Sequence, residues 1–465
     1  MQRYVCKFGG SSLADGVQFK KVADIIKARP VRKYVVASAP GKRYPDDTKV
    51  TDMLYSCYYS AAAGQNYELI LGQIRDRYLS IINDLGIDFD IDSEIDIIDS
   101  SLSRNPQKDY MASRGEYLNA KILAKYLDFG FLDAAECVHF DDNGVFLAEE
   151  TNRDLNAILT GREYVVIPGF YGAKADGTIV TFSRGGSDIT GSIVARAVIA
   201  DMYENWTDVS GMLSTDPRIV KNPLPIEALS YRELRELSYM GASVLHEDAV
   251  FPVRKANIPI NIRNTNRPDD AGTLISSELP RIPRKNKVTG IAGKKGFTAV
   301  LVEKSSMNSE IGFGMKMLKI FADFGVSFEH MPTGIDTMSV VCQTSLFEPH
   351  RDEIIETIKE ELKPDRFYVE DNLALIAVVG QGMAYSRGTA ARVMKGLSDA
   401  RINIKMIDQG STEINIIVGV DDVDYEAAIR GIYDAVMEGF FSCSAESGAA
   451  AFFRGSQGNV NEDIR

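Results

Sequence analysis

The sequence has few of the features that mark secreted or membrane proteins. Its 465 residues include five cysteines, which stand singly and form no Cys-x-x-Cys pair: Cys6, Cys57, Cys137, Cys342 and Cys443. This usage indicates neither a disulfide framework nor a zinc site. No run approaches the roughly 18 uncharged apolar residues of a membrane-spanning helix, and the chain opens as a strand rather than as a signal peptide. We therefore expect a cytoplasmic protein with no membrane contact.

Positive charge is also scarce. The chain carries 52 Lys and Arg against 65 Asp and Glu, a net charge of −13. A nucleic-acid surface needs clustered Lys and Arg, so we expect no nucleic-acid partner. With 45% apolar residues over 465 positions, the chain can bury the cores of about two to four domains. Any anionic ligand must then be held locally, by a few placed cations or by a metal.

The chain begins with a short apolar strand that leads into Lys7-Phe8-Gly9-Gly10-Ser11-Ser12. Two glycines between a strand and a helix let the backbone turn its N–H groups toward a phosphate, and Lys7 could reach the phosphate oxygens above them. The order is not that of a P-loop, in which the lysine follows the glycines. By itself the stretch leaves two interpretations open, a phosphate site and an ordinary turn.

The next segments extend this beginning into a parallel sheet. Residues 17–28 have the pattern of an amphipathic helix, and residues 33–38 that of a buried strand ending in Ser38-Ala39-Pro40-Gly41. This is β-α-β order with glycine turns at the strand ends. Ligands of such sheets gather at the carboxyl ends of the strands, so the two turns should share one edge.

A second Gly-Gly turn occurs later in the chain. A buried strand at residues 164–170 is followed by a hairpin, by Ser183-Arg184-Gly185-Gly186-Ser187-Asp188 and directly by a helix at 189–200. The strand at residues 203–209 then ends beside Asp208. Two such turns in one α/β domain favour a phosphate site over chance.

The acidic stretch at residues 81–110 imitates the spacing of a calcium loop. Such a loop needs a glycine at its sixth position and a glutamate at its twelfth, where this chain has Ser93 and Asp99. The interleaved isoleucines favour a partly buried helical insertion with a solvated acidic face. We assign no protein metal site here or elsewhere.

A basic, proline-containing segment at residues 279–286 predicts a domain linker. After it the pattern βαββαβ occurs twice, which indicates two compact α+β modules in tandem. The predicted domains are a catalytic domain at 1–285, a first module at 286–371, a second at 372–454 and a disordered tail at 455–465.

Taken in order, these stretches resemble the aspartokinases over nearly the whole chain. The motifs are Lys7-Phe8-Gly9-Gly10-Ser11-Ser12, Gly115-Glu116, Gly169-Phe170, Arg184-Gly185-Gly186-Ser187-Asp188, Trp206-Thr207-Asp208-Val209, Asp216-Pro217-Arg218 and Gly241-Ala242-Ser243-Val244-Leu245-His246. The resemblance implies an α/β amino-acid-kinase fold, a mainly parallel sheet sandwiched by helices, followed by two ferredoxin-like ACT modules. It also implies phosphoryl transfer from ATP with Mg²⁺ to L-aspartate, giving 4-phospho-L-aspartate, the first step toward lysine, methionine and threonine.

The resemblance assigns roles to individual residues. Lys7 and Asp188 are the implied catalytic pair, with Arg184 on the α-carboxylate of aspartate and Glu116 on its α-ammonium. Further pocket residues are Ser38, Thr51, Phe170 and Ser187. On the nucleotide side the matching positions are Lys7, Gly9, Gly10, Ser11, Thr207, Asp208, Asp216 and Arg218. Many relatives have a lysine where this chain has Ser243, so the adenine contact is the least secure part of the assignment.

The ACT modules imply regulation and pairing between subunits, as a homodimer or a tetramer. An amino-acid effector would sit at Gly312, Phe313, Ser327, Glu329, Thr333 and Asp336. Lysine is the leading effector, because the single-chain form with this spacing resembles the lysine-sensitive class; threonine, or both together, is the alternative. Two other functions stay open, namely another amino-acid kinase and a non-catalytic amino-acid sensor. A decayed kinase should have lost Lys7, Arg184 or Asp188, and all three are present.

Overall fold

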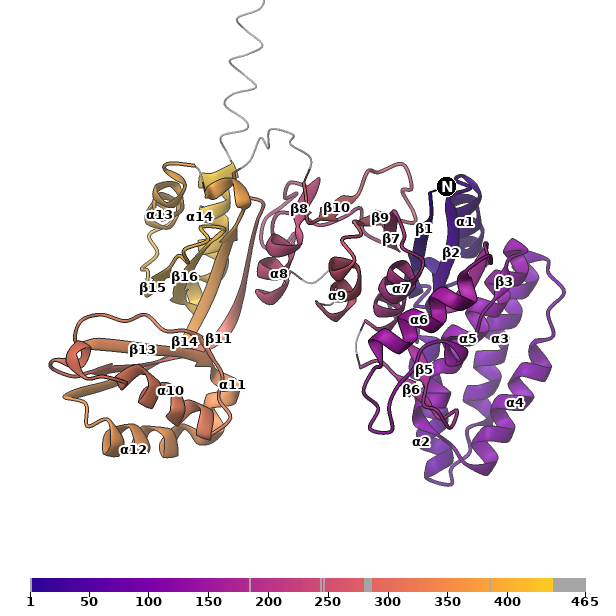
Figure 1. The fold of residues 1–465 in the computed structure, drawn as a ribbon, viewed down its shortest axis with the longest axis horizontal. Coiled ribbons are helices and arrows are strands. Elements are labelled where there is room, and N and C mark those ends of the chain that lie inside the picture. The colour runs from indigo at the N-terminus through magenta and orange to yellow at the C-terminus, as the bar shows by residue number, and fades with distance from the viewer. Residues whose placement is uncertain are drawn as a thin grey trace, which may run out of the picture. The chain divides into compact units, whose positions relative to one another are not determined.

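The computed structural model describes residues 2–183, 185–242, 245, 247–279, 287–384 and 386–437 (Figure 1). The chain forms two compact units, each with its own sheet. The first comprises Met1–Leu213, Leu224–Ser238 and Ser243–Ile282, and the second Ser214–Pro223, Tyr239–Ala242 and Pro283–Arg465. The predicted boundary at residue 285 and the predicted tail lie outside the described residues.

The first unit is built on an eight-stranded sheet in the order β3-β4-β2-β1-β7-β9-β10-β8. Its strands from β3 to β9 pair in parallel, and β10 runs antiparallel to β9. The bounds are β1 Tyr4–Phe8, β2 Arg32–Ala37, β3 Gly130–Phe131, β4 Val165–Pro168, β7 Met202–Thr207, β8 Ala228–Ser230, β9 Ile260–Asn264 and β10 Thr273–Ser276. The predicted mainly parallel sheet is confirmed. A separate hairpin pairs β5 (Tyr171–Ala173) with β6 (Ile179–Thr181).

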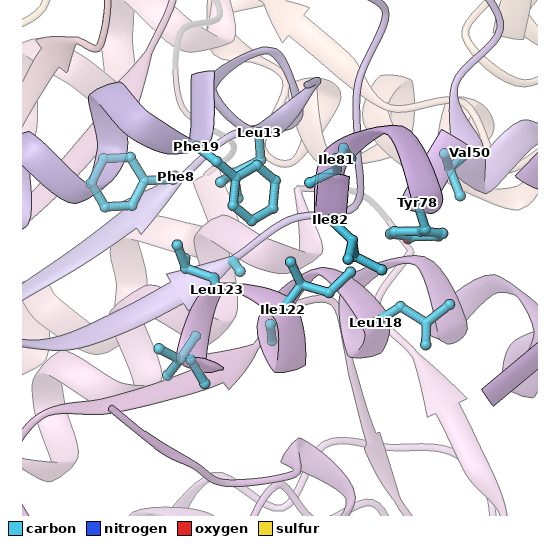
Figure 2. Packing of buried hydrophobic residues seen from close by; sticks show 14 of the residues in the cluster. Phe8, Leu13, Phe19, Val50, Tyr78, Ile81, Ile82, Leu118, Ile122 and Leu123 are labelled. Carbon is cyan, nitrogen blue, oxygen red and sulfur yellow. The ribbon is translucent and has the colours of Figure 1, made fainter. Parts of the chain in front are cut away.

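Helices cover both faces of this sheet. On one face, buried side chains of the sheet pack with those of the helices in one hydrophobic cluster, part of which Figure 2 shows. The helices of the unit are α1 Gly16–Lys27, α2 Val50–Ala62, α3 Glu68–Leu85, α4 Ile91–Arg104, α5 Lys108–Leu127, α6 Ala148–Leu159, α7 Gly186–Ala197, α8 Tyr231–Tyr239 and α9 Glu247–Lys255. Alternate residues of a strand point to opposite faces. Cys6 and Phe8 of β1 enter this cluster, which puts Lys7 on the face covered by α7.

The acidic stretch at residues 81–110 is helical, as predicted. Asp90 caps α4 by accepting a hydrogen bond from the Ser93 N–H at 3.1 Å. Ile91, Ile95 and Ile98 are buried, at a spacing that puts them on one side of the helix. The carboxylates therefore form a solvated face of the helix.

Beneath the centre of the sheet lies a buried charge network around Glu204 of β7, which is 1% exposed. Its carboxylate accepts two hydrogen bonds from Arg32, at 2.8 and 3.0 Å, and one from the Trp206 indole at 3.0 Å. The Arg263 guanidinium lies 3.7 Å from the same carboxylate. Burial, with the Glu204 charge next in size, holds the pKa of the neighbouring Cys6 thiol well above its usual value. Two arginines thus balance one buried carboxylate.

The second unit contains a six-stranded antiparallel sheet in the order β12-β13-β11-β14-β16-β15. Its strands are β11 Gly290–Glu303, β12 Phe328–His330, β13 Thr337–Gln343, β14 Arg366–Val379, β15 Met406–Asp408 and β16 Asn415–Asp421. The longer helices are α10 Phe313–Asp323, α12 Arg351–Glu361, α13 Thr389–Asp399 and α14 Tyr425–Met437, and α11 spans Thr344–Phe347. Both predicted α+β modules are present.

The two modules share their central strands. The second half of β11 pairs with β13 and with the first half of β14, whereas its first half pairs with Ala374–Val379, the part of β14 that also pairs with β16. The fourth strand of the second module is therefore the first half of β11, which comes before the other strands of the first module in the sequence. The predicted module boundary at 371 falls inside β14. Among the described residues, no helix has the length and apolar composition needed to span a membrane.

Candidate active site

An ion pair joins the two glycine turns that the sequence singled out. Lys7 lies near the carboxyl end of β1, and its Nζ is 2.6 Å from Oδ1 of Asp188 in the first turn of α7. The two side chains are 9% and 18% exposed. The Lys7 ammonium is thus held by Asp188 at the carboxyl end of a parallel strand and at the N-terminus of a helix, the edge at which ligands of parallel sheets bind.

Backbone groups arrange the first turn around this pair. The Gly9 N–H donates to the Trp206 carbonyl at 3.0 Å, which fastens the turn to β7. The Gly41 N–H donates to the Gly10 carbonyl at 2.8 Å, so the turns after β1 and β2 share one edge, as predicted. A Cβ on Gly41 would lie 2.6 Å from the Gly10 carbonyl carbon. These turns approach each other so closely that neither glycine has room for a side chain.

Glu116 lies on α5 and is 6% exposed. Burial raises the pKa of its carboxyl group to about 8, while a hydrogen bond from Ala39 and the charge of Lys7 lower it. None of the described residues is a hydrogen-bond partner of its Oε2. An unpaired buried acceptor is costly. The candidate site therefore contains a buried carboxyl group that is mostly neutral below about pH 8.

Asn119 follows Glu116 after one turn of α5 and is fully buried. Its Nδ2 donates to the Ser38 carbonyl at 2.7 Å, and its Oδ1 has no partner. Thr51 approaches from α2, because a Cβ on Gly115 would lie 3.7 Å from its Oγ1. The structure thus brings Ser38, Thr51 and Glu116 together around the middle of α5, and it adds Asn119.

The residues that follow β4 pack against the start of α7. Phe170 has a φ of 79°, and its N–H donates to Thr190 Oγ1 of α7 at 3.1 Å. A Cβ on Gly169 would lie 2.6 Å from Ser187 Cβ. A positive φ is strained for phenylalanine. The strained backbone of Phe170 lies where the residues after β4 pack against the first turn of α7. Strained residues of this kind are common at functional sites.

The residues proposed for the nucleotide divide between the two units. Thr207 and Asp208 follow β7 in the first unit, where Thr207 Oγ1 donates to Asp208 Oδ1 at 3.1 Å. Asp216 and Arg218 belong to the second unit and pair with each other at 2.7 Å. This ion pair holds the pKa of Asp216 below its usual value. Arg184 and Ser243 lie outside the described residues.

The residues proposed for an effector lie in the first module of the second unit. Glu329 accepts hydrogen bonds from the Tyr239 hydroxyl and, at 2.9 Å, from Gln343 Nε2. Asp336 Oδ1 accepts the Ser306 N–H at 2.8 Å. Gly312 is the N-cap of α10 with a φ of 81°, Phe313 is buried, and the Thr333 hydroxyl donates to the Met331 carbonyl at 3.1 Å. Ser327 precedes β12.

Two buried asparagines were missed by the sequence analysis. Asn119 is described above, and Asn205 of β7 donates to Asp188 Oδ1 at 2.8 Å. The sequence offered one signal, an asparagine among mainly apolar neighbours. Such a residue is expected to be buried, and a buried amide needs hydrogen-bond partners. The partners themselves come from distant parts of the chain, so the pattern alone did not reveal them.

Comparison with known proteins agrees with this geometry. The Amino acid kinase family matches residues 2–264, and an ACT domain matches residues 376–436. Aspartokinase 3 of Bacillus subtilis is 40% identical over 455 residues, covering 94% of this chain and 99% of that protein. The crystal structure of Clostridium acetobutylicum aspartate kinase is 50% identical, with a TM-score of 0.86, and covers 93% of this chain and 100% of that one.

A more distant structure shares the fold. E. coli aspartokinase III in complex with aspartate and ADP has a TM-score of 0.70 at 24% identity, covering 94% of this chain and 100% of that one. The parallel sheet, the lysine at its edge and the paired ACT-type modules define an amino acid kinase with a regulatory region. Within that class the chain belongs to the aspartokinases, and it is an aspartate kinase.

The close approach of Gly41 to Gly10 yields a testable prediction. Gly41→Ala puts a methyl group against the Gly10 backbone at 2.6 Å, which must separate the two turns. We expect the KM for ATP to rise by roughly tenfold or more, because the turn then presents its N–H groups in the wrong direction. Steady-state kinetics measures this. Gly72→Ala, where the added Cβ meets nothing within 4 Å, is the matched control, and equal effects of both substitutions would contradict the prediction.

Proposed function

We propose that this aspartate kinase moves the γ-phosphoryl group of ATP onto the side-chain carboxylate of L-aspartate at the edge of the parallel sheet, where Lys7 meets Asp188. The observation that carries the proposal is the buried Lys7–Asp188 pair beside the two glycine turns. A carboxylate nucleophile is already ionised, so the reaction needs no general base. It needs charge neutralisation and alignment.

The Lys7 ammonium would offset the repulsion between the two anionic reactants. Two unit negative charges 4 Å apart repel by about 4 kcal/mol at an effective dielectric constant of 20. An ammonium group with one donor on Asp188 keeps two donors for the phosphoryl oxygens. Gly10 and Ser11 would add backbone N–H groups at the same turn, which Gly9 holds in place through its bond to Trp206. Lys7 therefore acts on the group that is transferred.

Glu116 is assigned to the α-ammonium of aspartate, because it offers a buried oxygen without a partner. Arg184 is assigned to the α-carboxylate, since a guanidinium matches a carboxylate in a two-bond arrangement. Ser38, Thr51, Phe170 and Ser187 complete the pocket around the substrate. Together these groups would hold both charged ends of the amino acid and leave its side chain directed at Lys7.

On the nucleotide side we assign Thr207, Asp208, Asp216 and Arg218 to ATP. Mg²⁺ would bind chiefly to the phosphates, because it favours one or two carboxylates together with phosphate oxygens and water. Within the described residues no three His, Cys, Asp or Glu side chains form a metal site, and Asp188 would order Lys7 and the metal-bound phosphates. The metal supplies neutralisation of the phosphate charge.

Regulation is assigned to the first ACT-type module, with lysine as the leading effector. Glu329 would receive the effector's ammonium group, and Gly312, Phe313, Ser327, Thr333 and Asp336 would surround it. An ammonium at Glu329 competes with the donors that now occupy this carboxylate, Tyr239 and Gln343. Pairing of ACT-type modules between subunits, as a dimer or a tetramer, and a cytoplasmic location belong to the same proposal.

The role of Lys7 is tested by substitution. Lys7→Ala should lower kcat by several orders of magnitude with the fold intact, because the charge that opposes the repulsion is removed. A coupled ADP-release assay with aspartate, glutamate and carbamate measures both activity and substrate choice. Lys20→Ala, at an exposed position of α1, should keep full activity. Near-normal turnover of Lys7→Ala, or a preference for glutamate or carbamate, would disprove the assignment.

The role of Glu116 predicts a pH dependence. Its pKa is raised to about 8, so the free enzyme carries a neutral carboxyl group below that pH and a carboxylate above it. The ammonium of aspartate pairs with the carboxylate, so the KM for aspartate should fall roughly eightfold between pH 7.0 and 8.5. Glu116→Gln should raise this KM and remove its pH dependence. A wild-type KM that is flat over this range would contradict the assignment.

The effector assignment is tested by titrating activity with lysine and with threonine separately. We expect inhibition by lysine, and we expect Glu329→Gln to weaken it at least tenfold, because the substitution removes the charge that pairs with the ammonium. Glu348→Gln removes a carboxylate elsewhere in the same module, where it pairs with Arg351, and should leave inhibition unchanged. Insensitivity of the wild-type enzyme to both amino acids would reject the regulatory proposal.

A further inference from the structure

Asn205 lies beside the Lys7–Asp188 pair in the middle of the sheet. It belongs to β7, is 4% exposed, and stands opposite Lys7 in the parallel pairing of β1 with β7. Residues opposite each other in adjacent strands project to the same face of a sheet. The two side chains therefore rise together toward α7, which packs on both strands.

Both side chains reach the same oxygen atom. Lys7 Nζ lies 2.6 Å from Asp188 Oδ1, and Asn205 Nδ2 donates to this oxygen at 2.8 Å. The other oxygen, Oδ2, is left for groups that enter the site. A neutral amide donor restrains the carboxylate without cancelling its charge, whereas the ammonium both restrains and neutralises it.

The same strand also fixes the backbone of Asp188. The hydroxyl group of Tyr203, two residues before Asn205, donates to the Asp188 carbonyl at 3.1 Å. A Cβ on Gly191 would lie 2.5 Å from that hydroxyl oxygen, so the first two turns of α7 rest directly on Tyr203. Tyr203 thus sets the position of the Asp188 backbone, and Asn205 sets the direction of its carboxylate.

We propose that Asn205 is a positioning residue for phosphoryl transfer, which anchors Oδ1 of the Asp188 carboxylate so that Lys7 pairs with this one oxygen and keeps its remaining donors free for the transferred group. This inference rests on the proposed roles of Lys7 and Asp188. Without the amide, the Asp188 carboxylate can rotate and take both of its oxygens to the ammonium, which draws Lys7 away from the transferred group. Small errors of this kind reduce turnover strongly.

A double-mutant cycle tests the proposal. Asn205→Leu keeps the branching at Cγ and removes the donor; we expect kcat to fall about tenfold, with the KM values for ATP and aspartate changed less than twofold. In an Asp188→Asn background the same substitution should cause no further loss, because Asn205 acts through the Asp188 carboxylate. Equal fold losses in both backgrounds, or a loss confined to KM, would overturn the inference. Full activity of Asp188→Asn alone would instead refute the proposed role of Asp188.

Two further variants separate positioning from general loosening of the fold. Ser192→Ala removes a hydrogen bond that the Val253 N–H donates to another turn of α7, and it should leave kcat unchanged at matched thermal stability. Asn205→Asp keeps the size but donates only when its carboxyl group is protonated. Its kcat relative to the wild type should therefore rise as the pH is lowered. A pH-independent ratio, or an equal loss in Ser192→Ala, would contradict the proposal.

Discussion

The ion pair between Lys7 and Asp188 depends on the pairing of two strands and the placement of one helix. Lys7 comes from β1, its neighbour Asn205 from β7, and Asp188 from the helix that packs across both strands. A shift of β1 against β7 by one residue would move Lys7 to the opposite face of the sheet. The register is secured because Cys6 and Phe8 are fully buried on that opposite face.

The two faces of strand β7 therefore contact different parts of the protein. Tyr203 and Asn205 hold Asp188 on one face, while Glu204 and Trp206 form the buried charge network on the other. The network contacts two more elements of the sheet through Arg32 and Arg263. A buried carboxylate between two arginines is a directional restraint rather than a large source of stability. It ties β2, β7 and β9 together directly behind the catalytic edge.

The sequence allowed the sheet, the glycine turns and most of the candidate site to be predicted, since these depend on local patterns. Gly9-Gly10, Glu116 and Asp188 each stand in a recognisable stretch, and the structure brings them to one edge. The partnership of Asn205 with Asp188 and the contact of Gly41 with Gly10 could not be predicted, because they join segments that are distant in sequence. The sharing of β11 and β14 was missed for a similar reason: both modules have complete patterns, and only the pairing shows which strand completes which module.

Three features of the candidate site carry an energetic cost. Glu116 keeps an unpaired oxygen in a buried position, Asn119 does the same, and Phe170 holds a positive φ. Each of these features destabilises the free protein. If Glu116 receives the ammonium of aspartate, as proposed, binding would remove one of these penalties. These penalties persist because the sheet is held rigidly by Asn205, Tyr203 and the Glu204 network. In a less rigid sheet, Glu116 and Asn119 would shift until their unpaired oxygens found partners within the protein.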